Sequence, residues 1–217
     1  MRKIALFFLI VCCHFAFSQS KINFGLKKQL DSIMILETYR HNLHPLVDPL
    51  NKDTTVKGMS VADRADYARY WKRQDKIDSM NVVFVDSIFK KYGYPGKTLV
   101  GPGTVETAWI IMLHAKEVDK YLPIFKKAAE TNELPFRYYA MSLDRTFVKQ
   151  GKEQMYGTQG VCRKLNGGTD NVCFIWPVKD AATVNERRKQ AGFESTVEEN
   201  AKVMGIKYKV LKIEEVK

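Results

Sequence analysis

The chain has 217 residues, of which 35 are Lys or Arg and 24 are Asp or Glu, so its formal net charge is +11. Hydrophobic residues make up 45% and aromatic residues 12% of the sequence, which excludes a disordered chain and predicts one domain with a sizeable core. The basic residues occur singly or in pairs among carboxylates, as on a solvated surface and not in a nucleic-acid-binding stripe. Weak attraction to anionic lipid headgroups or envelope polymers is compatible with this charge.

The segment from Met1 to Ser18 has the pattern of an export signal. Arg2 and Lys3 precede a short apolar run, and Ala16-Phe17-Ser18 supplies the small residues of a cleavage site. We expect cleavage after Ser18 and a periplasmic or secreted protein without stable membrane insertion. No later segment approaches the roughly 20 apolar residues of a transmembrane helix. Cleavage would leave 33 basic and 24 acidic residues, a charge of +9.

Cys12 and Cys13 offer an alternative, because a cysteine that follows an apolar run can be acylated. They are preceded by Val11 and Cys12, where an acylation site would have a small residue. Cleavage after Ser18 is therefore favoured, and the choice stays open.

Apolar spacing predicts that the chain up to about residue 150 is helical. The helices are expected at 26–42, 61–92, 104–118, 119–131 and 135–149, with a loop over 45–60. Gly93-Tyr94-Pro95-Gly96 stops the long second helix. Thr104 is the expected N-cap of the third helix, and Pro135 suits the first position of the fifth.

The segment from Gly160 to Trp176 predicts a β-hairpin that folds back at Gly167-Gly168. Counting outward from this turn places Cys162 opposite Cys173. Opposed residues of a hydrogen-bonded pair have Cα atoms about 5.5 Å apart, which a disulfide tolerates. We expect a disulfide that stabilises the fold by about 3 kcal/mol. Metal-binding or redox thiols are disfavoured, because no histidine follows Cys162 and no Cys-x-x-Cys motif is present.

Helices and one more strand are expected in the last part of the chain. Asp180 is the expected cap of a helix to Gln190, and Ser195-Thr-Val-Glu198 predicts a capping box that opens another helix. Residues 206–213 are predicted to form a strand, and the pattern alone does not decide whether it pairs with the hairpin to form a three-stranded sheet. The predicted fold is mainly α (α+β), a helical domain with a small C-terminal β-hairpin or three-stranded sheet. One domain over 19–217 would contain an N-terminal helix and loop (19–60), a helical core (61–150) and the hairpin with C-terminal helices (151–217).

Short fragments in a fixed order suggest a relationship to a known family. They are Asp78-Ser-Met-Asn81, Tyr92-Gly-Tyr-Pro95, Val100-Gly101, Ala108-Trp109, His114-Ala115, Asp144-Arg145, Gln154-Met-Tyr-Gly-Thr-Gln159, and Arg187-Arg188 ahead of Ala191-Gly192. The chain thereby resembles DUF6624, a bacterial family of unknown function. It departs from the family pattern at Glu37-Thr38, where Asp-Gln is usual, at Tyr94 for Trp, and at Lys116 for Asp. The resemblance implies a mostly helical fold and names no substrate.

His114 lies on the same predicted helical face as Thr107, Ile110 and Ile111. One interpretation is a neutral imidazole in the core with a single hydrogen bond. The other is a general base, or a donor that orients a ligand, and the family fragment at this position favours it.

Asp144 interrupts the apolar face formed by Ala140, Leu143 and Phe147. An unpaired buried carboxylate costs several kcal/mol, so Asp144 needs a partner. One interpretation is a structural ion pair or a cap that holds a loop. The other pairs Asp144 with His114, or with Arg187 and Arg188, in a cleft.

The loop from Gln154 to Gln159 offers amides, a phenol, a hydroxyl and a flexible glycine, and it suits a binding role or a turn equally well. The predicted site consists of His114 and Asp144 as catalytic residues and of Arg145, Gln154, Tyr156, Thr158, Gln159, Arg187 and Arg188 as ligand-binding residues.

Standard catalytic and nucleotide-binding signatures are absent from the sequence, and no cofactor is predicted. His41 and His44 lie three residues apart, but they are read as exposed loop histidines, so no metal is predicted either. We therefore expect an exported protein that binds a polar ligand or is a hydrolase of the cell envelope. The alternative is a non-catalytic structural or interaction module of the envelope, so whether the protein is an enzyme stays open.

Overall fold

The computed structural model describes residues 22–42, 60–113 and 115–216. The predicted export signal with Cys12 and Cys13, most of the predicted loop at 45–60, His44 and His114 lie outside the described residues, as does the side chain of His41.

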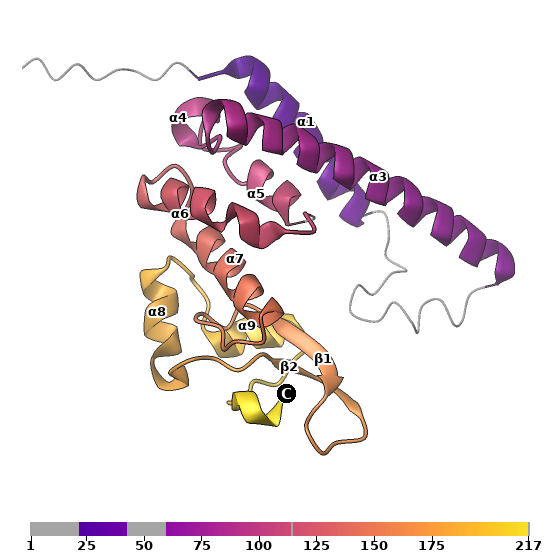
Figure 1. The fold of residues 1–217 in the computed structure, drawn as a ribbon, viewed down its shortest axis with the longest axis vertical. Coiled ribbons are helices and arrows are strands. Elements are labelled where there is room, and N and C mark those ends of the chain that lie inside the picture. Colours follow the sequence, from indigo (N-terminus) through magenta and orange to yellow (C-terminus); the bar gives the residue numbers. More distant parts are fainter. Residues whose placement is uncertain (1–21, 43–59, 114, 217) are drawn as a thin grey trace, which may run out of the picture.

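The described part of the chain is mainly helical, with one small sheet (Figure 1). Its helices are α1 (Phe24–Asn42), α3 (Val61–Tyr92), α4 (Lys97–Val100), α5 (Thr107–Met112), α6 (Leu122–Glu130), α7 (Phe136–Lys149), α8 (Val184–Gln190) and α9 (Val197–Val203). The 3-10 helices are η1 (Val118–Tyr121), η2 (Ala181–Thr183) and η3 (Ile213–Glu215), and the strands are β1 (Gly160–Lys164) and β2 (Asn171–Ile175). The prediction of a mainly α protein with a small C-terminal hairpin is confirmed.

The largest core cluster lies among the N-terminal helices. Leu30 of α1, Val85 of α3, Met112 of α5 and Phe125 of α6 are completely buried in it. Phe89 packs its ring edge-on against Phe125, with ring centroids 6.2 Å apart. Helix α3 runs along one side of this cluster, and α7 leads from the cluster to the hairpin and the C-terminal helices, which form the other end of the molecule in Figure 1.

Helix α3 begins and ends where the sequence predicts. Gly93 follows it with a positive φ of 75°, a conformation that glycine adopts without steric cost. Tyr94 then turns back into the core, where it is 9% exposed and donates its hydroxyl to the carbonyl of Val105.

The predicted N-cap at Thr104 is wrong, because this hydroxyl is used elsewhere. Thr104 donates to Asp31 of α1 at 2.6 Å and accepts a hydrogen bond from Lys27 at 2.9 Å. Helix α5 therefore begins three residues later and ends at Met112, well before the predicted end. Pro135 also lies one position outside α7, as its N-cap.

The hairpin has the predicted register, with Cys162 opposite Cys173 and a disulfide between them. The two Cα atoms are 4.0 Å apart, which is closer than in a hydrogen-bonded pair and nearer to the spacing of a non-hydrogen-bonded pair. The turn is also centred one residue earlier than predicted. Leu165 accepts the hydrogen bond of Gly168 at 3.0 Å, so the central residues are Asn166 and Gly167, and Gly167 has a φ of 77°.

Three predictions for the C-terminal part are wrong. The capping box lies at Thr196 and Glu199, because the carbonyl and hydroxyl of Ser195 accept hydrogen bonds from Arg188 instead. Asp180 makes no side-chain cap and has a left-handed φ of 46°. Residues 206–213 do not form a strand, so the sheet has two strands in the described part of the chain. Within this segment, the side chains of Ile206 and Leu211 pack into two small hydrophobic clusters beside β2.

No helix among the described residues is long and apolar enough to span a membrane.

Candidate functional site

Most of the residues that the sequence singles out converge on one loop, residues 153–159, which follows α7. Asp144 reaches this loop from α7, and Arg187 and Arg188 reach it from α8. Gln154 and Thr158 belong to the loop itself. The structure thus brings together residues that lie up to 44 positions apart in the sequence.

Asp144 is completely buried and caps this loop. Its Oδ1 accepts hydrogen bonds from the N–H groups of Met155 at 2.7 Å and Tyr156 at 3.1 Å. Its Oδ2 accepts from the N–H and the hydroxyl of Thr158, both at 3.0 Å, and from Tyr156 at 3.1 Å. Burial raises the pKa of the Asp144 carboxyl above its ordinary value, and these hydrogen bonds oppose that rise.

Gln154 closes the loop from within. This side chain is 0% exposed and donates to the carbonyls of Gln159 at 2.9 Å and Trp176 at 2.7 Å, while its own oxygen accepts from the N–H of Gln159 at 2.9 Å. Gly157 has a φ of 66°, and a Cβ at this position would lie 2.4 Å from a methyl group of Val197. The loop therefore packs closely on α9 and requires glycine there.

Arg188 is 1% exposed and holds the other side of the loop. It donates to the carbonyl of Tyr156 at 2.8 Å and to the carbonyl and hydroxyl of Ser195 at 2.8 and 3.0 Å, and its guanidinium lies 4.6 Å from the Phe193 ring centroid. Burial lowers the pKa of Arg188, and the charge of Asp144 opposes this change. Arg187 donates to the carbonyl of Met155 at 3.0 Å.

The remaining predicted residues contribute less to this cluster. Arg145 is exposed, Tyr156 is half-buried with its ring beside Phe193, and the Gln159 amide donates to the hydroxyl of Thr158 at 3.1 Å. The interpretation of Asp144 as a cap that holds a loop matches this geometry. The side chains of Asp144, Gln154 and Arg188 bond mostly to backbone groups of the loop and its neighbours. The catalytic role of Asp144 and the ligand-binding roles of the other residues stay predictions.

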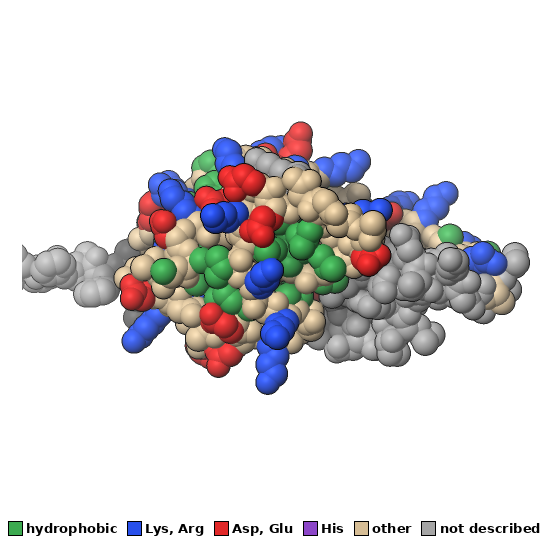
Figure 2. Space-filling view, turned by 90° about the horizontal axis from the view of Figure 1, so that it is seen from below, with side chains coloured by type: hydrophobic (Ala, Val, Ile, Leu, Met, Phe, Trp, Pro, Cys, Tyr) green, Lys and Arg blue, Asp and Glu red, His purple; other side chains and the backbone are tan. Residues whose placement is uncertain are grey.

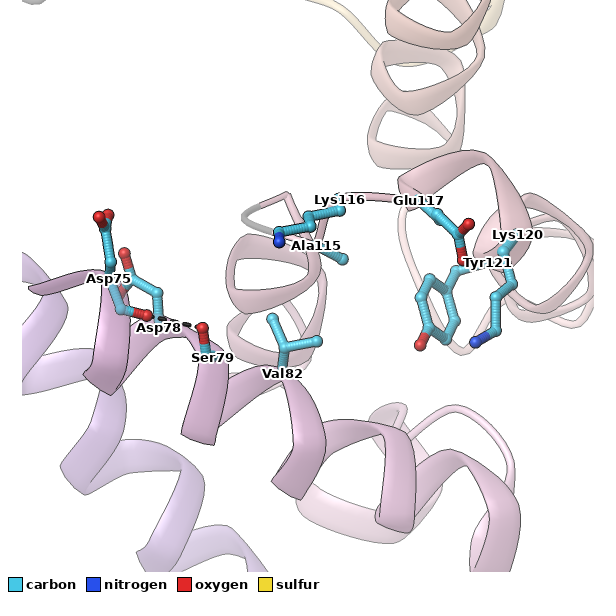
Figure 3. A pocket seen from close by; sticks show the side chains of 9 residues that line it. All are labelled: Asp75, Asp78, Ser79, Val82, Ala115, Lys116, Glu117, Lys120 and Tyr121. Atoms are coloured by element: carbon cyan, nitrogen blue, oxygen red, sulfur yellow. Dashed lines mark hydrogen bonds between the residues drawn. The ribbon is translucent and has the colours of Figure 1, made fainter.

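A groove lies elsewhere, between α3 and the segment that follows α5 (Figure 3). Its volume is about 740 Å³. It is lined by Asp75, Asp78, Ser79 and Val82 from α3 and by Ala115, Lys116, Glu117, Lys120 and Tyr121 from the other wall. In Figure 3 the Lys116 side chain points from its loop toward the side on which Asp75 and Asp78 lie. We call this cavity the α3 groove.

The α3 groove carries the carboxylates of Asp75 and Asp78 on one wall, and Lys116, Lys120 and the carboxylate of Glu117 on the other. Asp75 and Lys116 are exposed, whereas Asp78 and Val82 are partly buried and Tyr121 is 8% exposed. Asp78 accepts a hydrogen bond from the amide of Gln74 at 3.3 Å.

Contacts at both ends hold the second wall in place. Tyr121 donates its hydroxyl to Asp86 of α3 at 2.9 Å, and Lys149 of α7 donates to the carbonyl of Lys116 at 3.3 Å. Burial, followed by this bond to Asp86, raises the pKa of Tyr121 to about 12, so the phenol stays protonated and keeps donating. The hydrogen bond from Lys90, then that from Tyr121, lowers the pKa of Asp86.

Two of the fragments that carry the family resemblance meet at this groove, although they lie more than 30 positions apart in the sequence. Asp78 begins the first fragment, and Ala115 follows His114 in the second. Asp75, Asp78, Ser79 and Val82 recur at intervals of three and four residues, which places them on one face of α3. This spacing is the sequence signal from which this wall of the groove could have been predicted. Lys116 presents a positive charge on the wall opposite the α3 carboxylates.

Comparison with known proteins gives a single finding. The model of a family of unknown function, DUF6624, matches residues 60–213. The chain belongs to this family. The match includes the α3 groove and the whole Asp144 cluster, and it leaves α1 outside. No curated protein and no solved structure matches the chain. Within the described residues, no group of three or more His, Cys, Asp or Glu side chains is placed to hold a metal ion.

Proposed function

We propose that this DUF6624 protein is exported and binds a small polar ligand in the α3 groove. The ligand class is a molecule with both an amino and a carboxylate group, such as a short peptide. The observation that carries the proposal is the placement of Asp75 and Asp78 on one wall and of two lysines, Lys116 and Lys120, with one carboxylate, Glu117, on the other. A zwitterion would satisfy both walls, and Val82 and Tyr121 between them would contact its apolar part.

The burial and hydrogen bonding of Asp144 favour a binding protein over a hydrolase that uses Asp144. A general acid or base must exchange a proton with a substrate, yet both Asp144 oxygens accept hydrogen bonds from the loop at residues 153–159, and the side chain is inaccessible. The hydrolase alternative therefore depends on His114, which precedes Ala115 in the sequence. If His114 is a catalytic base, replacing it with alanine abolishes turnover of a bound peptide.

Export is supported by two features that are independent of the groove. The segment that ends at Ser18 has the pattern of a signal peptide. The cysteine pair at 162 and 173 forms a disulfide, which persists in oxidising compartments. Expression of the whole gene in a bacterial host, followed by fractionation and mass determination, tests this part. The expected mass is that of residues 19–217, and a cytoplasmic chain of full mass would contradict export.

Calorimetric titration with four matched probes tests the ligand class. Dialanine carries both charges, N-acetylalanine only the negative one, alanine amide only the positive one, and glucose neither. We expect millimolar binding of dialanine and at least tenfold weaker binding of the other three. Equal binding of dialanine and glucose, or no binding of any probe, would refute the proposed class.

Variants of exposed groove residues then locate the site. Asp75→Asn and Lys116→Gln each remove one charge without opening the core, and we expect each to weaken dialanine binding about tenfold. Asp170→Asn and Lys207→Gln remove the same charges from exposed positions outside the groove and serve as controls. Equal effects of the two pairs would place the ligand elsewhere.

A further inference from the structure

The outer face of α3 combines a strip of positive charge with exposed apolar side chains. Arg69, Lys72, Arg73, Lys76, Met80, Val83, Ser87, Lys90 and Lys91 are all exposed, and they recur at the three- and four-residue spacing of one helical face. From Arg69 to Lys91 this face is about 33 Å long at 1.5 Å per residue. We call it the basic face of α3.

No carboxylate lies on the basic face between residues 69 and 91. The acidic residues of α3 in that range are Asp75, Asp78 and Asp86, and they lie on the side that borders the α3 groove and η1. Arg69 pairs with Asp66, and Lys90 pairs with Asp86 at 2.6 Å. In the described part of the chain, Lys72, Arg73 and Lys76 have no ion-pair partner, so their charge is available to another molecule.

Met80 and Val83 lie in the middle of this face and are 62% and 70% exposed. Beside Met80, a shallow and largely apolar groove of about 490 Å³ runs between α3 and α1, and its lining includes Ile33, Phe84 and Lys28. Exposure of such apolar area to water is unfavourable, and covering it with an apolar partner lowers the free energy. Met80 and Val83 belong to none of the hydrophobic core clusters of the described residues, whereas Ile33 and Phe84 in the groove pack against the main one.

We propose that the basic face of α3 docks on the surface of an anionic lipid bilayer. Negatively charged headgroups would pair with Lys72, Arg73 and Lys76, while Met80 and Val83 would enter the boundary between headgroups and acyl chains. A soluble anionic polymer would match the charges but leave the apolar side chains in water. The lipid surface is the partner that satisfies both features.

This proposal is independent of ligand binding in the α3 groove. Asp75 and Asp78 point to a different side of α3, so a docked protein would keep the groove accessible. On the face seen from below the charges are mixed: Figure 2 shows Lys and Arg side chains interspersed with Asp and Glu around an apolar patch. Docking by net charge alone would therefore not select α3.

Vesicle co-sedimentation tests the proposal, with vesicles of pure phosphatidylcholine and vesicles of two parts phosphatidylcholine to one part phosphatidylglycerol. The purified protein should bind the anionic vesicles and not the neutral ones. Each lysine near an anionic surface raises the partition coefficient onto the vesicles about fivefold. The double variant Lys72→Gln with Lys76→Gln should therefore lower this coefficient about 25-fold. The double variant Lys72→Arg with Lys76→Arg should bind like the wild type.

A second pair of variants separates a lipid surface from a polyanion. Met80→Ser with Val83→Ser should weaken vesicle binding about tenfold and leave binding to dextran sulfate unchanged. The matched controls are Lys202→Gln with Lys207→Gln and Val203→Ser with Val210→Ser, because these residues are exposed on the C-terminal part, with Val203 89% and Val210 60% exposed. They should change binding less than twofold.

Three results would overturn the proposal. Equal binding to neutral and anionic vesicles would exclude charge recognition. Equal effects of the α3 variants and the C-terminal controls would exclude α3 as the docking face. Vesicle binding that is insensitive to Met80→Ser with Val83→Ser would identify the partner as a polyanion and not a lipid surface. Any variant is compared only after its melting temperature matches that of the wild type.

Discussion

Replacing Asp144 with asparagine is the sharpest test of the capped loop. The substitution keeps the shape of the side chain but turns one acceptor oxygen into an NH2 donor. In either orientation at least two of the loop's hydrogen-bond donors face that group: Met155 and Tyr156 at Oδ1, or Thr158 and Tyr156 at Oδ2. The substituted loop therefore contains N–H groups that have lost their acceptor.

The expected cost follows from these contacts. Hydrogen bonds to a charged acceptor contribute about 1.5–3 kcal/mol each, and release of a buried charge from its desolvation offsets part of the loss. We expect Asp144→Asn to lower the free energy of unfolding by about 3 kcal/mol and the melting temperature by about 9 °C. Urea denaturation followed by circular dichroism measures the first quantity, and Asp170→Asn on an exposed hairpin residue is the control, with a change below about 0.5 kcal/mol.

A catalytic carboxylate would behave differently. Catalytic side chains are commonly destabilising in the folded state, so their removal leaves stability unchanged or raises it. A loss below about 1 kcal/mol for Asp144→Asn would refute the loop-cap interpretation and revive the catalytic one.

Three further substitutions test separate parts of the fold. Gly157→Ala should lower the free energy of unfolding by about 3 kcal/mol, because φ is 66° and the new methyl group meets Val197. Adding Val197→Ala should recover part of this loss, as measured by chemical denaturation, because it removes the clash. If the effects of the two substitutions are fully additive, the contact is contradicted. Cys162→Ser with Cys173→Ser should lower stability by about 3 kcal/mol for a separation of 11 residues, and a loss below about 1 kcal/mol would show that the bridge constrains little. Asp86 has a lowered pKa in the folded protein, so its contribution is present above the unfolded pKa near 3.9 and is lost as the pH falls below it. Asp86→Asn should therefore reduce the acid-induced loss of stability between about pH 4 and pH 2 by about 0.2–1 kcal/mol, and an unchanged pH profile would contradict this pairing.

The parts of the fold that local rules determine were predictable from the sequence. Helix α3 was predicted with both ends correct, because a long apolar periodicity is stopped by Gly93 and Pro95. The hairpin register followed from the glycine turn and the cysteine pair, although the turn itself is centred at Asn166-Gly167.

The errors arose where a side chain has a tertiary partner that outcompetes the local one. Thr104 bonds to Asp31 of a distant helix instead of capping α5, and Ser195 accepts from Arg188 instead of capping α9. Residues 206–213 have the composition of a strand but bury Ile206 and Leu211 without pairing their backbone.

The candidate site was predictable only in part, for a similar reason. The sequence indicated that Asp144 needs a partner, and it singled out the loop from Gln154 to Gln159 and the arginines Arg187 and Arg188. It did not reveal that the partners are mostly backbone N–H groups of that loop, because every sequence contains such groups. The α3 groove depends on the packing of α3 against residues 115–121, more than 30 positions away, and this packing has no local pattern.

Amide chemical-shift mapping tests ligand binding in the α3 groove most directly. A 15N-labelled sample is titrated with dialanine, and the shifted backbone resonances are assigned. Binding in the α3 groove predicts that the largest changes fall at residues 75–82 and 115–121, and that Lys116→Gln requires about tenfold more dialanine to produce them. Largest changes at residues 153–159, or no change at all, would contradict it.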